Sequence, residues 1–248
     1  MAVKSAERVL KIFELLEENS HGLTNKEISE SLGFAPSSTL GLLQTMSENG
    51  YLLADEQKRY SLGGRLLSLG AVAASRFDVS RMATPYMKEL MKSLDETCFL
   101  GVLSGDEIIY IAKENCERTM ATNANIGSRK PVYCTGLGKA FLAFLDKEER
   151  ELILQRIDLR PYTKHTVDSF DKLREEIEGF KSLGYAVDDQ EIEEGLWCIA
   201  APIYNGYGKM IAAISISGLR ERMLAKKDRL VEELLRVSPK LSQDLGYY

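Results

Sequence analysis

The sequence predicts an α+β fold divided into two domains. The chain has 248 residues, more than one compact domain usually holds, so two domains are the better expectation. Short helical patterns fill the N-terminal part, and in the rest antiparallel hairpin patterns stand at both ends of a helical centre. That order indicates a sheet covered by helices.

The N-terminal part opens with two helical patterns. Lys4–Asn19 places its apolar side chains on one broad stripe, as an amphipathic helix does. Thr24 is a candidate N-cap, and Glu27 follows three residues later as in a capping box. Gly33 then ends a short second helix.

A third helix and a hairpin complete this part. Pro36 stands at a first helical position and Gly50 closes the helix. Two short strands, Tyr51–Ala54 and Arg59–Leu62, flank a polar turn. Three helices followed by a hairpin predict a winged helix-turn-helix. The alternative is a generic three-helix lobe that packs or dimerises, because helix-turn-helix shape alone is a weak signal.

Two further helical patterns lead into the second domain. Arg65–Arg76 is rich in apolar residues, and Val79–Leu94 carries an apolar side. Pro85 either lies in the first turn of the second helix or kinks it. We take residues 63–78 as a linker helix, so the predicted domains are 1–62 and 79–248 on either side of it.

The second domain alternates strands and helices. The predicted strands are 98–103, 108–112, a run near 118–124, 185–187, 196–204 and 209–217. Four helices are predicted: one that starts at Thr135, and three that cover 147–157, 170–183 and 225–245.

Composition excludes several classes of protein. The net charge of −5 argues against a globally basic nucleic-acid coat, so any DNA contact must be local. The chain shows neither the apolar core of a signal peptide nor a membrane span, and we expect it in the cytoplasm. Four cysteines without a C-x-x-C pair and two histidines give no zinc-site spacing, so we expect reduced thiols.

Four stretches resemble the IclR-type transcriptional regulators, named for the isocitrate lyase regulator. They are GLTNKEISESLGFAPSSTLGLLQTMSENGYL, KRYSLGGRLLSLG, RKPVYCTGLGKAFLAFL and GYAVDDQEIEEGLWCIAAPIYN. The resemblance implies a homodimer or homotetramer whose N-terminal domains bind a palindromic operator. It also implies a GAF-like C-terminal domain that binds a small metabolite and alters DNA binding.

A recognition helix reads base edges with the side chains near its N-terminus. In this chain the candidates are Ser37, Ser38 and Thr39, with Gln44 one to two turns later. The alternative for the two serines is that they only cap the helix.

Phosphate contacts are expected from basic residues outside that helix: Lys4, Arg8, Lys26, Lys58 and Arg59. Gly41 stands where members of the family commonly have an arginine, and the helix itself holds no basic residue. Residues 1–64 contain six basic and nine acidic side chains, a net charge of −3. One such domain should therefore bind DNA weakly, and we expect several copies to act together on one operator.

The resemblance also implies an effector site between the sheet and the helix that TGLGKA begins. Its candidate residues are Gly136 and Leu137 with their backbone amides, Asp189, Cys198, Ser215 and Ser217. Unpaired amides at a helix N-terminus favour an anion such as a carboxylate. The two serines alternate on a strand and therefore point to one face.

Each side chain has an ordinary structural alternative. Asp189 can cap or bond the backbone of its loop, and Cys198 can be a plain buried thiol. A strand register shifted by one residue would turn Ser215 and Ser217 to solvent. We expect Trp197 to face away from Cys198, as cover for helices or an interface.

The stretch TGLGKAFLAF, residues 135–144, looks like a phosphate loop but lacks the spacing. A Walker loop needs four residues between its first glycine and a Gly-Lys pair followed by Ser or Thr, and here Ala140 follows Lys139. Lys139 is then a solvent-facing or helix-packing residue. The acidic residues of 188–194 lack EF-hand spacing, so we predict no metal and no cofactor.

Two other classes of function remain as alternatives. Cys134 or Cys198 with His165 could form a cysteine hydrolase, although no motif orients a base against either thiol. The second alternative is a ligand-sensing or oligomerisation module whose N-terminal domain has lost DNA binding. The sequence favours a transcriptional repressor controlled by a small carboxylate, and it does not identify the metabolite, the operator or the sign of the effect.

Overall fold

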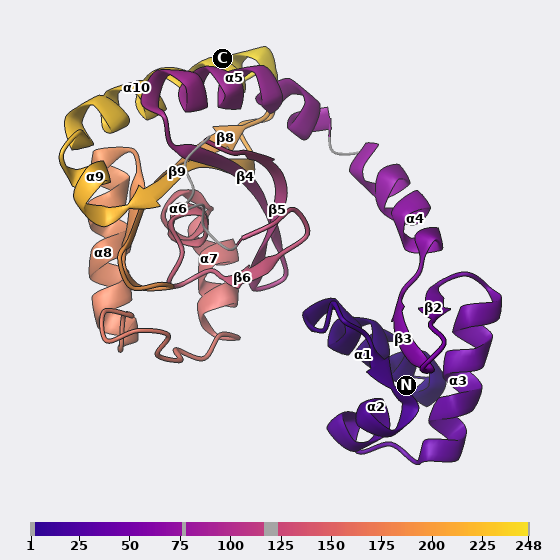
Figure 1. Ribbon diagram of the computed structural model, residues 1–248. Helices are drawn as coiled ribbons and strands as arrows, with labels where there is room; N and C mark the ends of the chain where they lie inside the picture. The colour runs from indigo at the N-terminus through magenta and orange to yellow at the C-terminus, as the bar shows by residue number, and fades with distance from the viewer. Residues whose placement is uncertain (1–2, 76–77, 117–123, 248) are drawn as a thin grey trace. The chain divides into compact units, whose positions relative to one another are not determined.

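The structure is a computed structural model that describes residues 3–75, 78–116 and 124–247. The chain divides into two compact units, Met1–Arg76 and Phe77–Tyr248, and each is described by itself (Figure 1). Of the strand predicted near 118–124, residues 118–123 lie outside the described residues, and residue 124 is not in a strand. Residues 76–77, near the end of the predicted linker, also lie outside the described residues. None of the helices searched within the described ranges is long and apolar enough to cross a membrane.

The first unit is a winged helix-turn-helix followed by a helix, as predicted. Its elements are α1 (Lys4–Glu18), β1 (Leu23–Thr24), α2 (Asn25–Leu32), α3 (Pro36–Glu48), β2 (Leu52–Ala54), β3 (Arg59–Leu62) and α4 (Gly64–Ser75). The three strands form an antiparallel sheet in the order β1-β3-β2. A small core of Ile12, Leu16, Ile28, Leu43 and Met46 joins α1, α2 and α3.

Local signals place the two helices of the helix-turn-helix. The Thr24 side chain accepts from the Glu27 amide, and the Glu27 carboxylate accepts from the Thr24 amide at 2.7 Å. Gly33 ends α2 with φ of 64°, a left-handed conformation that glycine adopts without strain. Pro36 then begins α3, where its missing N–H costs no hydrogen bond.

The second unit is built on one antiparallel sheet of six strands in the order β6-β5-β4-β9-β8-β7. The strands are β4 (Thr97–Ser104), β5 (Glu107–Glu114), β6 (Arg129–Pro131), β7 (Ala186–Asp189), β8 (Leu196–Tyr204) and β9 (Met210–Leu219). The helices are α5 (Asp78–Leu94), α6 (Gly136–Phe144), α7 (Lys147–Leu154), α8 (Phe170–Leu183), α9 (Arg220–Leu224) and α10 (Lys227–Asp244).

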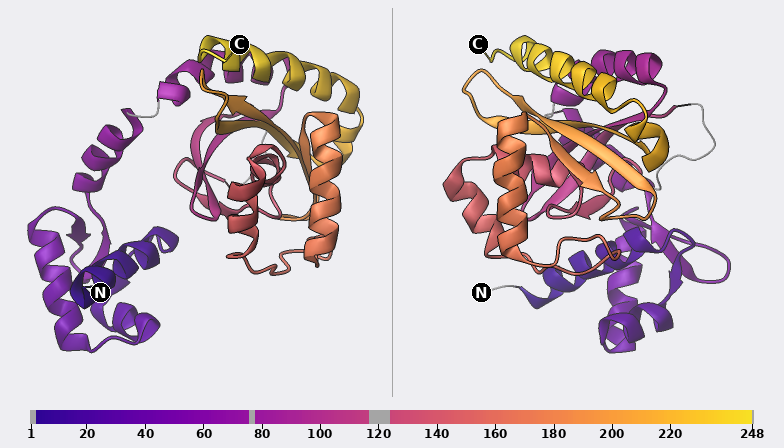
Figure 2. Two further views of the ribbon diagram at one scale, coloured as in Figure 1. Left: turned by 180° about the vertical axis from the view of Figure 1, so that it is seen from behind. Right: turned by 90° about the vertical axis from the view of Figure 1, so that its left-hand side faces the viewer.

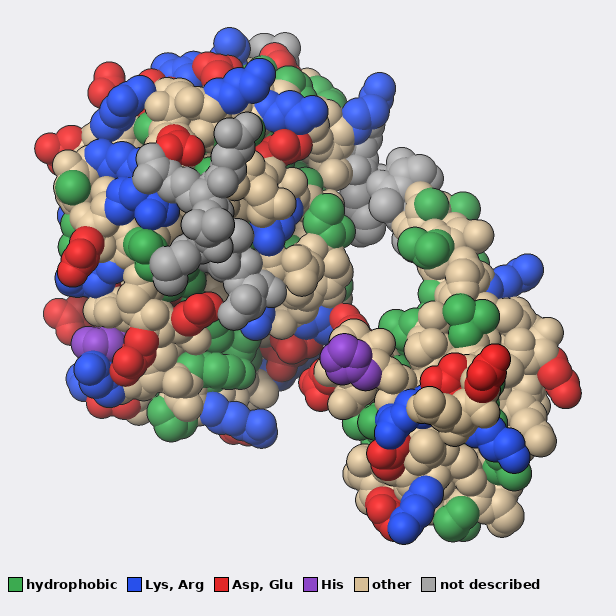
Figure 3. Space-filling view, in the orientation of Figure 1, with side chains coloured by type: hydrophobic (Ala, Val, Ile, Leu, Met, Phe, Trp, Pro, Cys, Tyr) green, Lys and Arg blue, Asp and Glu red, His purple; other side chains and the backbone are tan. Residues whose placement is uncertain are grey.

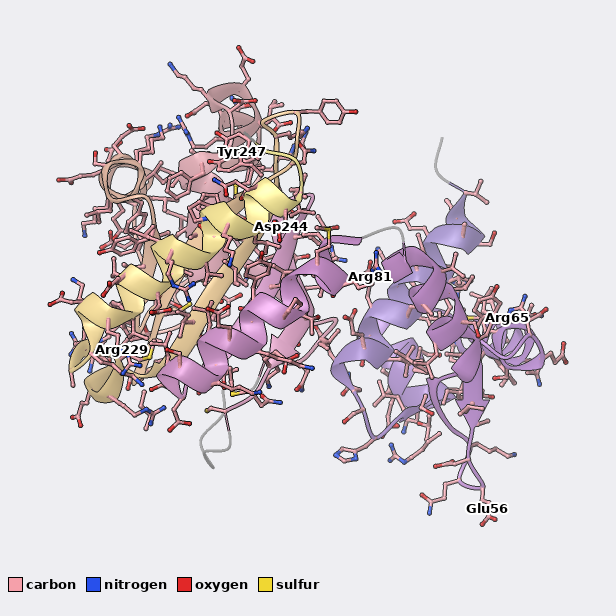
Figure 4. The ribbon with its side chains drawn as sticks, turned by 90° about the horizontal axis from the view of Figure 1, so that it is seen from above. Glu56, Arg65, Arg81, Arg229, Asp244 and Tyr247 are labelled. Atoms are coloured by element: carbon pink, nitrogen blue, oxygen red, sulfur yellow. The ribbon has the colours of Figure 1, made fainter. Side chains whose placement is uncertain are left out.

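Helices cover both faces of this sheet (Figure 2). On one face α5 and α10 lie side by side, as the view from above shows (Figure 4), and Arg229 of α10 donates to the Ser93 carbonyl of α5 at 2.9 Å. The helix α5 continues through Pro85, so the proline does not lie in its first turn. On the other face α6 packs against β7, β8 and β9, with α8 beside it. The sheet therefore separates two hydrophobic cores.

A buried carboxylate fixes α9 and α10 to the start of β4. The Glu96 side chain is fully buried. It accepts two hydrogen bonds from Arg222, at 2.5 and 2.6 Å, and forms an ion pair with Lys226 at 2.8 Å. A buried charge is tolerated when it is paired and hydrogen-bonded in this way.

The first turn of α6 touches the segment that precedes it. A Cβ atom added at Gly138 would lie 2.3 Å from the Val132 carbonyl oxygen and 2.4 Å from its Cα. Both atoms belong to the backbone, so no side chain can move aside. Only glycine allows α6 to start this close to residues 132–135.

We predict that Gly138→Ala destabilises the protein by about 3 kcal/mol, because the added methyl forces the backbone apart. The matched control is Gly179→Ala in α8, where an added Cβ meets no atom within 4 Å. That change should be neutral or should stabilise the protein by up to about 1 kcal/mol. Chemical denaturation of both variants measures the difference, and equal stabilities would contradict the close approach.

Candidate functional site

The first candidate site is the exposed face of α3, the recognition helix of the winged helix-turn-helix. Its buried face holds Leu43 and Met46. Ser37, Ser38 and Gln44 are exposed, as a DNA-reading surface requires.

Thr39 is not on that exposed face. Its side chain is fully buried, and its hydroxyl donates to the Ala35 carbonyl at 3.1 Å. Thr39 stands in the first turn of α3, which makes it a candidate from sequence, but helical geometry turns this residue toward α1.

Arg8 of α1 holds the start of α3. Its Nη2 donates to the Ser38 hydroxyl at 3.0 Å and to the Thr39 hydroxyl at 3.2 Å. The guanidinium also lies 4.4 Å from the centre of the Phe34 ring, a cation–π distance. A cation from α1 therefore stands at the N-terminus of a helix that has none of its own.

The basic residues predicted to contact phosphates differ in their exposure and in their ion pairing within the protein. Lys26 and Lys58 are exposed, and Lys26 is 3.9 Å from Glu30. Arg59 donates to the Gly22 carbonyl at 2.9 Å and pairs with Glu27 at 3.4 Å. Because its charge is already paired, Arg59 stabilises the wing more than it attracts DNA.

Acidic side chains stand beside these cations. Asp55 and Glu56 lie in the turn between β2 and β3, and Glu56 is at its tip (Figure 4). Basic and acidic side chains alternate on the visible surface of this unit (Figure 3). Any attraction to phosphates from a single copy is therefore small.

The second candidate site lies on the α6 face of the large sheet. Cys198 of β8 pairs with Ser217 of β9, and Ala200 pairs with Ser215. These side chains are buried on the same face, opposite to Trp197, which packs in the core under α5 and α10. The predicted register is confirmed for the two serines and for the tryptophan.

The N-terminus of α6 meets this group of side chains. The Thr135 hydroxyl caps the helix by accepting from the Gly138 amide at 3.1 Å, which leaves the Gly136 and Leu137 amides outside the cap. A Cβ at Gly136 would lie 2.6 Å from Cys198 Sγ. Glycine at this position therefore lets the thiol approach the helix terminus.

Cys198 is a neutral thiol at the centre of the group. Burial raises its pKa to about 12, although the neighbouring Ser217 and Ser215 hydroxyls and the Gly136 amide act to lower it. Three donors thus converge on one point beside the helix terminus. They would serve an anion at that point better than they serve a neutral thiol.

Ser215 has unused hydrogen-bonding capacity. Its side chain is 1 % exposed, and its hydroxyl oxygen has no hydrogen-bond partner among the described residues. A buried hydroxyl without a partner is costly, and such groups need an explanation. A bound ligand that forms a hydrogen bond with this hydroxyl would explain why it lacks a protein partner.

The structure places Asp188, rather than Asp189, at this site. Asp189 is half-exposed on the opposite side of β7, where Arg220 donates to both of its oxygens at 2.6 and 3.0 Å. Asp188 is buried and pairs with Cys198 in the sheet. Successive strand residues face opposite ways, so an error of one position exchanges the two carboxylates.

Lys139 is one of the most deeply buried side chains, which excludes the solvent-facing alternative. Its ammonium bonds to Glu191 and, at 2.6 Å, to Glu176 of α8. Burial acts to lower the pKa of Lys139, but the two carboxylates outweigh it and raise that pKa. Nothing local in the sequence indicates this cluster, because its members are far apart in the chain.

A cavity of about 110 Å³ opens next to the group. Its lining includes Phe99, Tyr110, Lys130, Tyr162, Glu193 and Ser217. The Phe99 and Tyr110 rings meet edge to face at 5.1 Å. Lys130 and the aromatic side chains were not predicted, because nothing local in the sequence shows that they share a cavity. A hollow of about 340 Å³ lies beside α7, and one of about 390 Å³ lies beside the segment that follows α7. Neither is lined by a predicted effector residue.

The side chains considered for a hydrolase are not arranged for catalysis. Burial raises the pKa of the Cys134 thiol, as it does for Cys198. His165 is exposed, whereas both thiols are buried. Neither thiol therefore has an imidazole base beside it.

Comparison with known proteins assigns both domains to one family. Residues 5–56 match the IclR helix-turn-helix domain, and residues 71–243 match the bacterial transcriptional regulator IclR C-terminal domain. The HTH-type transcriptional regulator KdgR of Escherichia coli is 35% identical over 98% of this chain and 94% of its own. The HTH-type transcriptional repressor AllR of the same species is 32% identical over 93% of this chain and 84% of its own.

Solved structures give the same assignment. The IclR structure from Thermotoga maritima is 28% identical, with a TM-score of 0.77 over 98% of this chain and 99% of that one. An IclR homolog from Microbacterium hydrocarbonoxydans, complexed with 4-hydroxybenzoate, shares the fold at 23% identity, with a TM-score of 0.84 over 97% and 98% of the two chains. With a helix-turn-helix domain, an effector domain and relatives that regulate transcription rather than catalyse reactions, this chain belongs to the IclR family of DNA-binding transcriptional regulators.

Proposed function

We propose that the protein is a repressor that binds a palindromic operator as a homo-oligomer, and that a small carboxylate bound in the second unit changes this binding. The observation that carries the ligand class is the unpaired, buried Ser215 hydroxyl beside the uncapped amides of α6. A carboxylate accepts hydrogen bonds from hydroxyls and amides and is favoured at a helix N-terminus.

The effector would contact the Gly136 and Leu137 amides, Cys198, Ser215 and Ser217. The aromatic side chains of the adjoining cavity would hold its apolar part. Lys130 lines that cavity, and no partner of its ammonium is found within the described residues. An ammonium in the lining of the cavity favours an acid over a neutral ligand.

The DNA contacts that we propose are Ser37, Ser38 and Gln44 for base edges, with Lys26 and Lys58 for phosphates. Arg8 and Thr39 would hold the helix, and Arg59 the wing. With a net charge of −3 over residues 1–64, one copy would bind weakly, so joint binding by several copies supplies the affinity.

The surface that would join two copies is α4. Exposed apolar side chains follow this helix and the strand end before it: Leu62, Leu67, Leu69 and Val72. Figure 3 shows hydrophobic side chains along the helix. Soluble proteins rarely expose such a run unless something covers it. A second copy of this chain is the partner that fits a palindromic operator, because a dimer and such an operator each have a two-fold axis.

For the pocket, we predict that Ser215→Ala loses at least half of the thermal stabilisation given by a carboxylate, because a ligand hydrogen bond is removed. Without ligand the variant should be no less stable, since the deleted hydroxyl has no partner. Thermal-shift assays with acetate, lactate and 4-hydroxybenzoate test this, with Ser182→Ala on the exposed side of α8 as the control. Equal stabilisation of all three proteins would remove Ser215 from the site.

For the oligomer, we predict that Leu67→Glu lowers the fraction of dimer, because its side chain is 79% exposed in the single chain and a charge there opposes apolar contact. Leu53→Glu, at an exposed leucine of the wing, is the control. Sedimentation velocity of the full-length proteins measures the mass. An unchanged dimer in the Leu67 variant would place the interface elsewhere.

For DNA binding, we predict that Lys58→Gln reduces the slope of log K against log salt by about 0.9 for each copy bound to the operator, because each copy loses one phosphate contact. The probe is a duplex from the promoter of the protein's own gene, titrated by fluorescence anisotropy. Lys164→Gln, a 73% exposed lysine of the second unit, should leave the slope unchanged. The same loss in both variants would indicate a general charge effect without contact by the wing.

A further inference from the structure

The buried charges next to the effector site do not balance. Among the described residues, the buried charged side chains near this site are Asp188, Glu191 and Lys139; Arg150 of α7 is also buried, but it lies 3.9 Å from Glu151. The Lys139 ammonium already bonds to Glu191 and Glu176. One cation is therefore shared by two carboxylates before Asp188 is counted.

No cation contacts Asp188 among the residues that the structure describes. Its side chain is 1% exposed, and Oδ1 accepts from the Glu191 amide at 2.8 Å. The groups around it are Glu191 in the following loop, Lys139 of α6, Cys198 of β8, Cys134 before α6 and Tyr110 of β5. Burial raises the pKa of both thiols and of the phenol, so these three groups are neutral and add no positive charge.

The proposed carboxylate would lie close to this unbalanced charge. Asp188 and Cys198 are direct partners across β7 and β8, and such partners have Cβ atoms about 5 Å apart. Cys198 in turn adjoins Gly136 at the start of α6. Two carboxylates that share a buried site cannot both stay ionised without a cation between them.

We propose that Asp188 is protonated when the effector is bound, so that each carboxylate enters the pocket together with one proton from solvent. This inference rests on the proposed function, because it needs a carboxylate at the α6 terminus. The proton adds to the Asp188 carboxylate, no covalent bond to the effector forms, and the buried site gains no net charge. The O–H of the neutral Asp188 can then donate a hydrogen bond to the carboxylate of the effector.

The ionisation of Asp188 in the free protein agrees with this inference. Burial raises the pKa of Asp188 to about 7, and the nearby Glu191 adds to the rise, against the lowering effect of backbone amides and Lys139. Near neutral pH the free protein is therefore a mixture of protonated and ionised forms. An arriving anion favours the protonated form, so binding takes up protons above this pH and few below it.

The test is the pH dependence of affinity in the full-length protein, by isothermal titration with acetate, lactate and 4-hydroxybenzoate between pH 6 and 8.5. We expect Kd to rise toward tenfold per pH unit above pH 7 and to level off near pH 6. Asp188→Asn, which is neutral at every pH, should bind with a pH-independent Kd and about 30-fold more tightly than the wild type at pH 8.5.

Asp189→Asn is the matched control. This neighbouring carboxylate is paired with Arg220 outside the pocket, so its variant should keep the pH dependence of the wild type. Titration at pH 8 in two buffers of different ionisation enthalpy should show uptake of close to one proton by the wild type and none by Asp188→Asn.

The outcomes separate this inference from the proposed function. Binding of a carboxylate with a pH-independent Kd in the wild type would overturn the proton uptake and leave the effector class intact. The same pH dependence in Asp188→Asn would show that another group takes the proton, which overturns the assignment to Asp188. Absence of binding by all three acids would overturn both proposals.

Discussion

The second unit depends on one buried ion cluster, in which Lys139 joins α6 to Glu191 and Glu176. Residues 136–143 of α6 are buried, so the helix lies inside the unit rather than on it. A buried ammonium is stable only with its carboxylates in place. The loop after β7 and the helix α8 are therefore fixed against α6. This arrangement puts Asp188 next to the helix terminus and gives the pocket a rigid floor.

The first unit solves a different electrostatic problem. Its recognition helix holds no cation, and its overall charge is negative, yet it must approach a polyanion. Arg8 stands at the N-terminus of α3 through its bonds to Ser38 and Thr39. In the proposed joint binding by several copies, a weak single unit would make operator binding depend steeply on assembly, because affinities of linked sites multiply. Weak individual contacts would then suit a regulator that an effector releases from DNA.

The sheet of the second unit is the physical link between its two faces. Cys198 and Ser215 face the pocket, whereas their strand neighbours Trp197 and Ile216 pack in the core under α5 and α10. The helix α5 follows α4 directly in the chain. A ligand changes DNA binding only if it binds two states of the protein with different affinities. A shift of β8 and β9 on ligand binding would reach α5 through those buried side chains.

The sequence by itself determined the α+β class, the winged helix-turn-helix and the family. These predictions rest on local signals, which need only residues that are close in the sequence. Examples are the Thr24–Glu27 capping box and the alternation of Ser215 and Ser217. The tertiary structure decided which side chains meet. Asp188 replaced Asp189 at the pocket because strand alternation turns an error of one residue into the opposite face. Thr39 turned inward because helix orientation follows from packing against α1. Lys139, with Glu176 and Glu191 distant in sequence, became buried because only the folded chain brings their charges together.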